Sequence, residues 1–226
     1  MSRVCVFDVN ETLLDLGAMD PFFARLFGDA GVRRAWFAQL LQSALVATVT
    51  GAYTDFGTIG DAALAMVAER QGTLLTDSDR QALRDTMQHL PPHPEVQESL
   101  QRLRDAGLRL AALTNSTAVV AEAQMRNAGL TAYFEQILSA DSVRRLKPAP
   151  EPYLMAADRL GVPPAGVRLV AAHYWDIAGA LRVGFAAAFV ARAGQVLDPL
   201  APRPDVVGAD LRAVADQIIA LEGGSR

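Results

Sequence analysis

Cysteine is almost missing from this sequence, because Cys5 is the only one among 226 residues. One cysteine cannot form a disulfide within the chain, so we expect a cytoplasmic protein. Cys5 lies between Val4 and Val6, which indicates a buried structural thiol. Clusters of basic residues are missing too, and the net charge of −4 is spread along the chain. We therefore expect no nucleic-acid partner.

Long apolar runs are also absent from the sequence. No stretch approaches the roughly 20 residues of a membrane-spanning helix. The N-terminus enters a strand pattern at once, without the basic and apolar segments of a leader peptide. We therefore expect neither a membrane partner nor a targeting segment. The apolar share of 51% is enough for one large domain, or for a core domain with an insert.

Five apolar segments predict buried strands, and helical patterns lie between most of them. Strands that alternate with helices indicate an α/β fold with a doubly wound, mostly parallel sheet. The predicted strands are residues 3–8, 109–114, 136–139, 167–172 and 186–190.

One segment breaks this alternation. From about residue 18 to residue 89 the pattern is helical, with no convincing strand. We expect residues 17–91 to form a helical cap domain, inserted into a core domain made of residues 1–16 and 92–226. Such a cap can cover a site at the sheet edge and exclude water, whereas the plain alternative is that its helices only flank the sheet. An apolar stripe predicts packing within the cap, a homodimer interface, or both: Trp36, Leu40, Leu41, Leu45, Val46 and Val49.

Polar residues follow the predicted strands, where the carboxyl ends of a parallel sheet place ligands. Asp8 ends the first strand and is a candidate nucleophile. Lys147 is the natural cation to orient it, although a surface lysine capped by Pro148 is the alternative. Thr114 and Asn115 follow the second strand, where a hydroxyl, an amide and free N–H groups favour an anion site or simple helix capping.

Four signatures occur in order, and each lies at a predicted strand end or in the loop after it. Together with the helical insert, the Lys-Pro-x-x-x-x-Tyr run ending at Tyr153 and the Trp-Asp pair, they resemble the haloacid dehalogenase superfamily. Within it, the chain is most similar to the type II (S)-2-haloacid dehalogenases. The signatures are Phe7-Asp8-Val9-Asn10-Glu11-Thr12-Leu13, Leu113-Thr114-Asn115-Ser116, Lys147-Pro148 and His173-Tyr174-Trp175-Asp176.

The resemblance implies an α/β core with an inserted cap and a hydrolase that acts on carbon–halide bonds. It implies that Asp8 attacks the halogen-bearing carbon of a short (S)-2-haloalkanoic acid, and that water then hydrolyses the aspartyl ester to a 2-hydroxy acid. The catalytic residues implied are Asp8, Thr12, Lys147, Tyr153, His173 and Asp176. The substrate contacts implied are Val9, Asn10, Phe37, Thr114, Asn115 and Trp175.

Metal ligands are scarce in these motifs. Phosphatases of the superfamily hold Mg²⁺ with several acids and place an acid/base aspartate two residues after the nucleophile. Here that position is the neutral Asn10, and only Asp8 and Asp176 are available. Halide leaves without a proton, so dehalogenation needs neither Mg²⁺ nor an acid/base aspartate. We expect no metal and no cofactor. A small-molecule phosphatase, or a member that has lost dehalogenase activity, remains the alternative.

Two positions depart from the family pattern. The best-known members carry an Arg directly after a Trp of the cap, where it binds the departing halide, but here Trp36 is followed by Phe37. Arg33 or Arg34 could reach the site from the preceding helical turn. His173 stands where the family typically has an Asn, and it is either a general base or a structural histidine.

Overall fold

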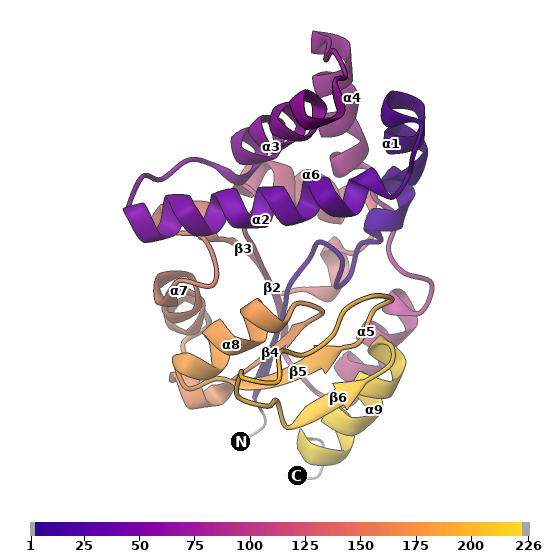
Figure 1. The fold of residues 1–226 in the computed structure, drawn as a ribbon. Coiled ribbons are helices and arrows are strands. Elements are labelled where there is room, and N and C mark those ends of the chain that lie inside the picture. The colour runs from indigo at the N-terminus through magenta and orange to yellow at the C-terminus, as the bar shows by residue number, and fades with distance from the viewer. Residues whose placement is uncertain (1–2, 223–226) are drawn as a thin grey trace.

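A six-stranded sheet with helices on both faces forms the centre of the computed structural model, which describes residues 3–222 (Figure 1). All neighbouring strands pair in parallel in the order β3-β2-β1-β4-β5-β6, so β1 lies inside the sheet. The predicted doubly wound parallel α/β fold is therefore confirmed. The strands are β1 (Val4–Phe7), β2 (Leu110–Thr114), β3 (Gln136–Ser139), β4 (Val167–Ala171), β5 (Ala186–Val190) and β6 (Val206–Gly208).

The strands are continuous apolar runs because both faces of the sheet are covered. In β1, Val4 and Val6 face one cluster of the core, and Cys5 and Phe7 face the other. Burial raises the pKa of the Cys5 thiol to about 12, which agrees with a structural role. All five predicted strands are present to within one residue at each end. The short edge strand β6 was not predicted, since three residues carry too little pattern.

Five helices cover the sheet. α5 (Val96–Asp105), α6 (Ala118–Asn127) and α9 (Leu211–Glu222) contribute to the cluster that contains Cys5 and Phe7. α7 (Pro150–Leu160) and α8 (Tyr174–Arg182) contribute to the opposite cluster. The two layers keep the sheet dry and leave its carboxyl edge for polar groups.

Four further helices lie between β1 and α5 in the chain, and Figure 1 shows them above the sheet. They are α1 (Asp20–Phe27), α2 (Val32–Thr50), α3 (Phe56–Gln71) and α4 (Asp77–Gln88). The Asp55 side chain caps α3 by accepting from the Thr58 N–H. Within the described chain, no helix has the length and apolar character required to cross a membrane.

The apolar stripe of α2 packs into the core only along its first half. Trp36 and Leu40 are buried, and the Trp36 indole N–H donates to the carbonyl of Gly60 at 3.0 Å. Leu45, Val46 and Val49 are 42%, 56% and 85% exposed, so only part of the stripe packs in the core. These three residues leave an apolar surface on α2.

Candidate active site

Four adjacent strands bring the predicted polar residues to one edge of the sheet. Asp8 directly follows β1, and Thr114 ends β2. Lys147 lies in the segment between β3 and α7, and His173 immediately precedes α8, after β4. Since β3, β2, β1 and β4 are neighbours in that order, residues far apart in sequence meet at this edge.

Asp8 is held as a buried anion. Its Oδ1 lies 3.0 Å from Nζ of Lys147, and its Oδ2 accepts a 2.6 Å hydrogen bond from the hydroxyl of Thr12. Burial alone would raise the pKa of Asp8, but the charge of Lys147 and contacts with His173 and Thr12 hold it well below the ordinary value. The carboxylate is therefore ionised over the whole neutral range.

Lys147 uses all three of its donors within the protein. Nζ donates to Asp8 Oδ1, to Asp176 Oδ2 at 2.6 Å and to the carbonyl of Leu113 at 2.9 Å. Burial would lower the pKa of Lys147, but the carboxylates of Asp176 and Asp8 raise it above the ordinary value. The ammonium thus stays charged and faces two carboxylates. This geometry excludes the alternative of a surface lysine.

Asp176 links Lys147 to Tyr153. The Tyr153 hydroxyl donates to Asp176 Oδ1 at 2.6 Å, and both side chains are buried. Burial and the charge of Asp8 raise the pKa of Asp176, although Lys147 opposes them. The close approach of Tyr153 requires Gly179, because a Cβ there would lie 2.6 Å from the tyrosine oxygen. Tyr153 does not hydrogen-bond to Asp8 itself and is connected to it through Asp176 and Lys147.

Thr12 fixes the second carboxylate oxygen of Asp8. Its hydroxyl donates to Asp8 and accepts from the backbone N–H of Ala172 at 2.9 Å. One side chain therefore connects the loop after β1 to the end of β4.

His173 has one engaged and one free ring nitrogen. Nδ1 lies 3.3 Å from Asp8 Oδ2, and the ring stacks on Trp175 with centroids 5.2 Å apart. Because a carboxylate only accepts, Nδ1 carries the hydrogen of this contact. The lone pair of a neutral ring then lies on Nε2, which is buried and has no hydrogen-bond partner among the described residues.

Two asparagine amides near the site are already hydrogen-bonded. Asn115 accepts from the Lys147 N–H at 2.7 Å and donates to the Lys147 carbonyl at 3.3 Å, so it braces the lysine backbone. Asn10 accepts from Gln124 at 3.0 Å and contacts Ser116. Gln124 was not singled out from the sequence. The only signal in the sequence was that this amide lies in α6 among apolar residues, some of which are buried.

A small cavity lies beside Asp8, with about 240 Å³ of empty space. It brings together seven of the predicted site residues, whereas Val9, Thr12, Lys147, Tyr153 and Asp176 do not line it. The Val9 side chain packs in the hydrophobic core. Leu41, expected only as part of the apolar stripe, and Phe56, not singled out at all, complete the wall. The seven are Asp8, Asn10, Phe37, Thr114, Asn115, His173 and Trp175.

The cavity wall at Phe37 is apolar. Arg33 pairs with Asp20, its Nε lying 2.5 Å from the carboxylate. With Arg34 it lines an outer cleft, which shares Phe37, Leu41, His173 and Trp175 with the cavity. Neither arginine lines the cavity, so the expectation that one reaches it is not met in this structure. Among the described lining residues, none is Lys or Arg.

The residues present do not make a dedicated metal cage. Nowhere in residues 3–222 do three His, Cys, Asp or Glu side chains cluster as metal ligands. Asp8 and Asp176 both direct an oxygen at the Lys147 ammonium. The lysine therefore neutralises the charge that a divalent ion would otherwise bind.

The fold is that of a known hydrolase class. A family model described as haloacid dehalogenase-like hydrolase matches residues 2–184, and the chain belongs to this family. The resemblance expected from the motifs is therefore confirmed.

Within the family, the similar proteins are 2-haloacid dehalogenases. The chain is 30% identical to (S)-2-haloacid dehalogenase 2 of Pseudomonas sp. (strain CBS-3), over 91% of this chain and 90% of that protein. It is 33% identical to the (S)-2-haloacid dehalogenase of Xanthobacter autotrophicus, over 86% of this chain and 77% of that protein. A solved structure of L-2-haloacid dehalogenase from X. autotrophicus with chloropropionic acid covalently bound superposes with a TM-score of 0.90, at 26% identity and full coverage of both chains.

Proposed function

We propose that the protein hydrolyses short (S)-2-haloalkanoic acids to 2-hydroxy acids, through an ester on Asp8 and without a metal ion. The observation that carries the proposal is the Asp8 carboxylate, held ionised by Lys147 at the wall of a small, largely apolar cavity. The activities named for the similar proteins support the same reaction class.

In the first step, an oxygen of Asp8 forms a bond to C2 of the substrate, and the carbon–halogen bond breaks with inversion. The halide leaves with the bonding electron pair and takes no proton. Thr114 is suited to bind the substrate carboxylate. Its Oγ1 accepts from the Ser116 N–H at 3.2 Å, so its own hydrogen is free to donate. The N–H groups at the start of α6 add to this anion site.

In the second step, water attacks the ester carbonyl carbon of Asp8. We assign removal of the water proton to His173, whose ring lies beside the nucleophile with Nδ1 3.3 Å from Asp8 Oδ2. Lys147 stabilises the oxyanion, and collapse of the intermediate releases the 2-hydroxy acid and restores the carboxylate. Tyr153 and Asp176 act through Lys147, whose position they fix.

Further parts of the proposal concern the assembly and the two domains. Residues 17–91 act as the cap over the core formed by residues 1–16 and 92–226. The exposed residues Leu45, Val46 and Val49 of α2 support a homodimer, which light scattering of the purified protein tests. A single free Cys5 is consistent with a cytoplasmic location.

Halide release provides the decisive test. Both enantiomers of 2-chloropropionate are incubated with the protein and with Asp8→Asn, with and without EDTA. We expect chloride from the S enantiomer only, no release by the variant, and no effect of EDTA. Chloride release that requires added Mg²⁺, or turnover of p-nitrophenyl phosphate without any chloride release, would overturn the proposal.

A further inference from the structure

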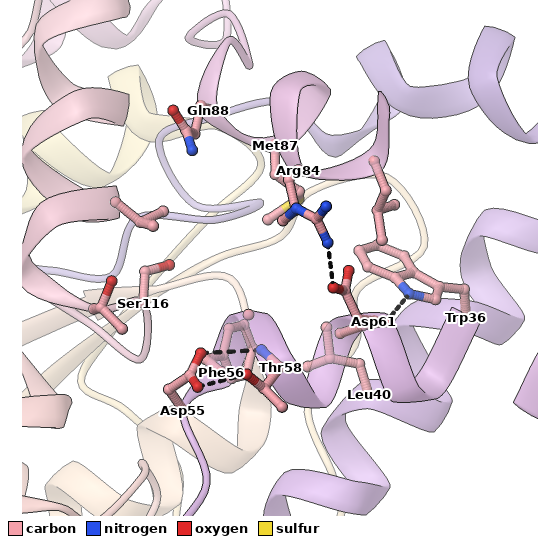
Figure 2. A pocket seen from close by; sticks show the side chains of 15 residues that line it. Trp36, Leu40, Asp55, Phe56, Thr58, Asp61, Arg84, Met87, Gln88 and Ser116 are labelled. Carbon is pink, nitrogen blue, oxygen red and sulfur yellow. Dashed lines mark hydrogen bonds and ion pairs between the residues drawn. The ribbon is translucent and has the colours of Figure 1, made fainter. Parts of the chain in front are cut away.

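A second, larger cavity lies between the helices α2, α3 and α4 and the start of α6 (Figure 2). It has about 960 Å³ of empty space against about 240 Å³ for the catalytic cavity, and both volumes include space open to solvent. No step of the proposed reaction uses it. Much of its wall is apolar and consists of Trp36, Leu40, Phe56, Leu83, Met87 and Val120.

The two cavities share one side chain and one loop. Phe56, the first residue of α3, lines both cavities and is only 6% exposed. Thr114 and Asn115 line the catalytic cavity, and the next residues, Ser116 and Thr117, line the larger one. The Phe56 side chain therefore lies in the wall between them.

The charges of the larger cavity favour a neutral occupant. Figure 2 shows the Arg84 guanidinium paired with Asp61, at 2.5 Å, and Asp55 hydrogen-bonded to Thr58. Oδ1 of Asp61 is buried without a hydrogen-bond partner among residues 3–222. Two carboxylates against one guanidinium disfavour an anionic group, while the apolar wall stabilises hydrocarbon.

We propose that this cavity is the tail subsite of the catalytic site, with Phe56 as the gate between them. The substrate class is then a 2-halo acid with an unbranched alkyl tail, whose carboxylate and C2 stay beside Asp8. This inference rests on the proposed function and extends its substrate range to chains of about six carbons. Each methylene transferred to an apolar wall increases kcat/KM by up to roughly fourfold.

Val120 and Val119 provide a matched pair of variants on α6. Val120 lines the cavity, whereas its neighbour Val119 is 79% exposed and does not. We expect Val120→Trp to lower kcat/KM for 2-bromohexanoate about tenfold, with less than about a twofold change for 2-bromopropionate. Val119→Trp should change neither. Equal effects of Val120→Trp on both substrates would overturn the tail subsite.

A binding measurement separates this inference from the proposed reaction. Trp36 and Trp175 are the only tryptophans, and Trp36 lines the larger cavity. In Trp175→Phe, we expect hexanoate, which has no halogen, to shift Trp36 emission. Hexanedioate, with a second carboxylate at its tail, should not. No shift with hexanoate, or equal shifts with both acids, overturns the tail subsite even if 2-chloropropionate is dehalogenated. A shift without any dehalogenation supports the subsite while the proposed function fails.

Discussion

The ammonium of Lys147 donates to the carboxylate of Asp8 across 3.0 Å, with both side chains almost completely buried. The same ammonium also faces Asp176, so one cation serves two buried carboxylates. Lys147 is the only lysine in the chain, which otherwise uses arginine as its basic residue. The three donors of the compact ammonium match its three acceptors, Asp8, Asp176 and the carbonyl of Leu113.

Lys147→Met tests this arrangement. Removing the cation leaves two buried carboxylates, which should cost about 3–5 kcal/mol in the free energy of unfolding and abolish halide release. In the natural protein the folded pKa of Asp8 is lowered, so its stabilisation is present above the unfolded pKa and is lost as pH falls through the folded pKa. In the variant, burial raises the folded pKa of both carboxyls, so their contribution is present at acidic pH and lost as pH rises.

Urea unfolding at pH 5 and pH 8 measures the effect. In the natural protein, the contribution of Asp8 to stability should be the same at pH 5 and pH 8. Lys147→Met should be less stable at pH 8 than at pH 5. The control is Arg212→Met, which breaks an exposed ion pair with Glu98 and should leave stability nearly unchanged. Equal losses in the two variants would contradict the central role of Lys147.

Much of the site was predictable because parallel topology places strand ends together. Asp8 and Lys147 are 139 residues apart, yet each follows a strand, and the carboxyl ends of the two strands meet at one edge of the sheet. The sequence could not show where amide side chains point. Asn115 accepts a hydrogen bond from the Lys147 backbone, and Gln124 of α6 donates to Asn10. Neither contact was predictable, because both depend on the conformation of the loops that carry Asn10 and Lys147.

The fold, too, could be predicted from the sequence only in part. Strands β1 to β5 follow from apolar runs that are buried on both faces. Trp36 and Leu40 of α2 are buried, whereas Leu45, Val46 and Val49 further along the same helix are exposed. Periodicity identifies the apolar side of a helix, but the neighbouring helices decide how far along the axis it is covered.

His173→Ala tests the general base. The variant keeps Asp8 and Lys147, so the first step should proceed, while hydrolysis of the ester loses its proton acceptor. We expect a burst of one halide per active site, followed by turnover slowed about 10²–10⁴-fold. Stopped-flow halide detection and intact-mass analysis of the ester measure both. Unchanged steady-state turnover, with the same pH profile between pH 5 and 9, would assign His173 a structural role.

Thr12→Val tests the positioning of the nucleophile. Valine keeps the shape of threonine but removes the 2.6 Å donor to Asp8 and the acceptor for the Ala172 N–H. Leaving that buried N–H unpaired should cost about 1–3 kcal/mol of stability. We also expect kcat to fall about tenfold or more with little change in KM, because the loosened carboxylate is less often aligned for attack. Thr12→Ser, which retains the hydroxyl, should restore most of kcat, and failure to do so would rule out a hydrogen-bonding role.

Phe37→Arg tests whether the apolar wall limits halide departure. Phe37 lies beside His173, with ring centroids 5.6 Å apart, and the lining of this cavity contains no arginine or lysine in the described chain. A guanidinium there would stabilise the charge that develops on the leaving halide, so we expect kcat for 2-chloropropionate to rise about tenfold or more. The gain should be smaller for 2-iodopropionate, because iodide spreads its charge over a larger radius. Phe37→Leu is the control, since it opens the same space without adding charge. Equal rates for the arginine and leucine variants would mean that the halide leaves by another wall of the cavity.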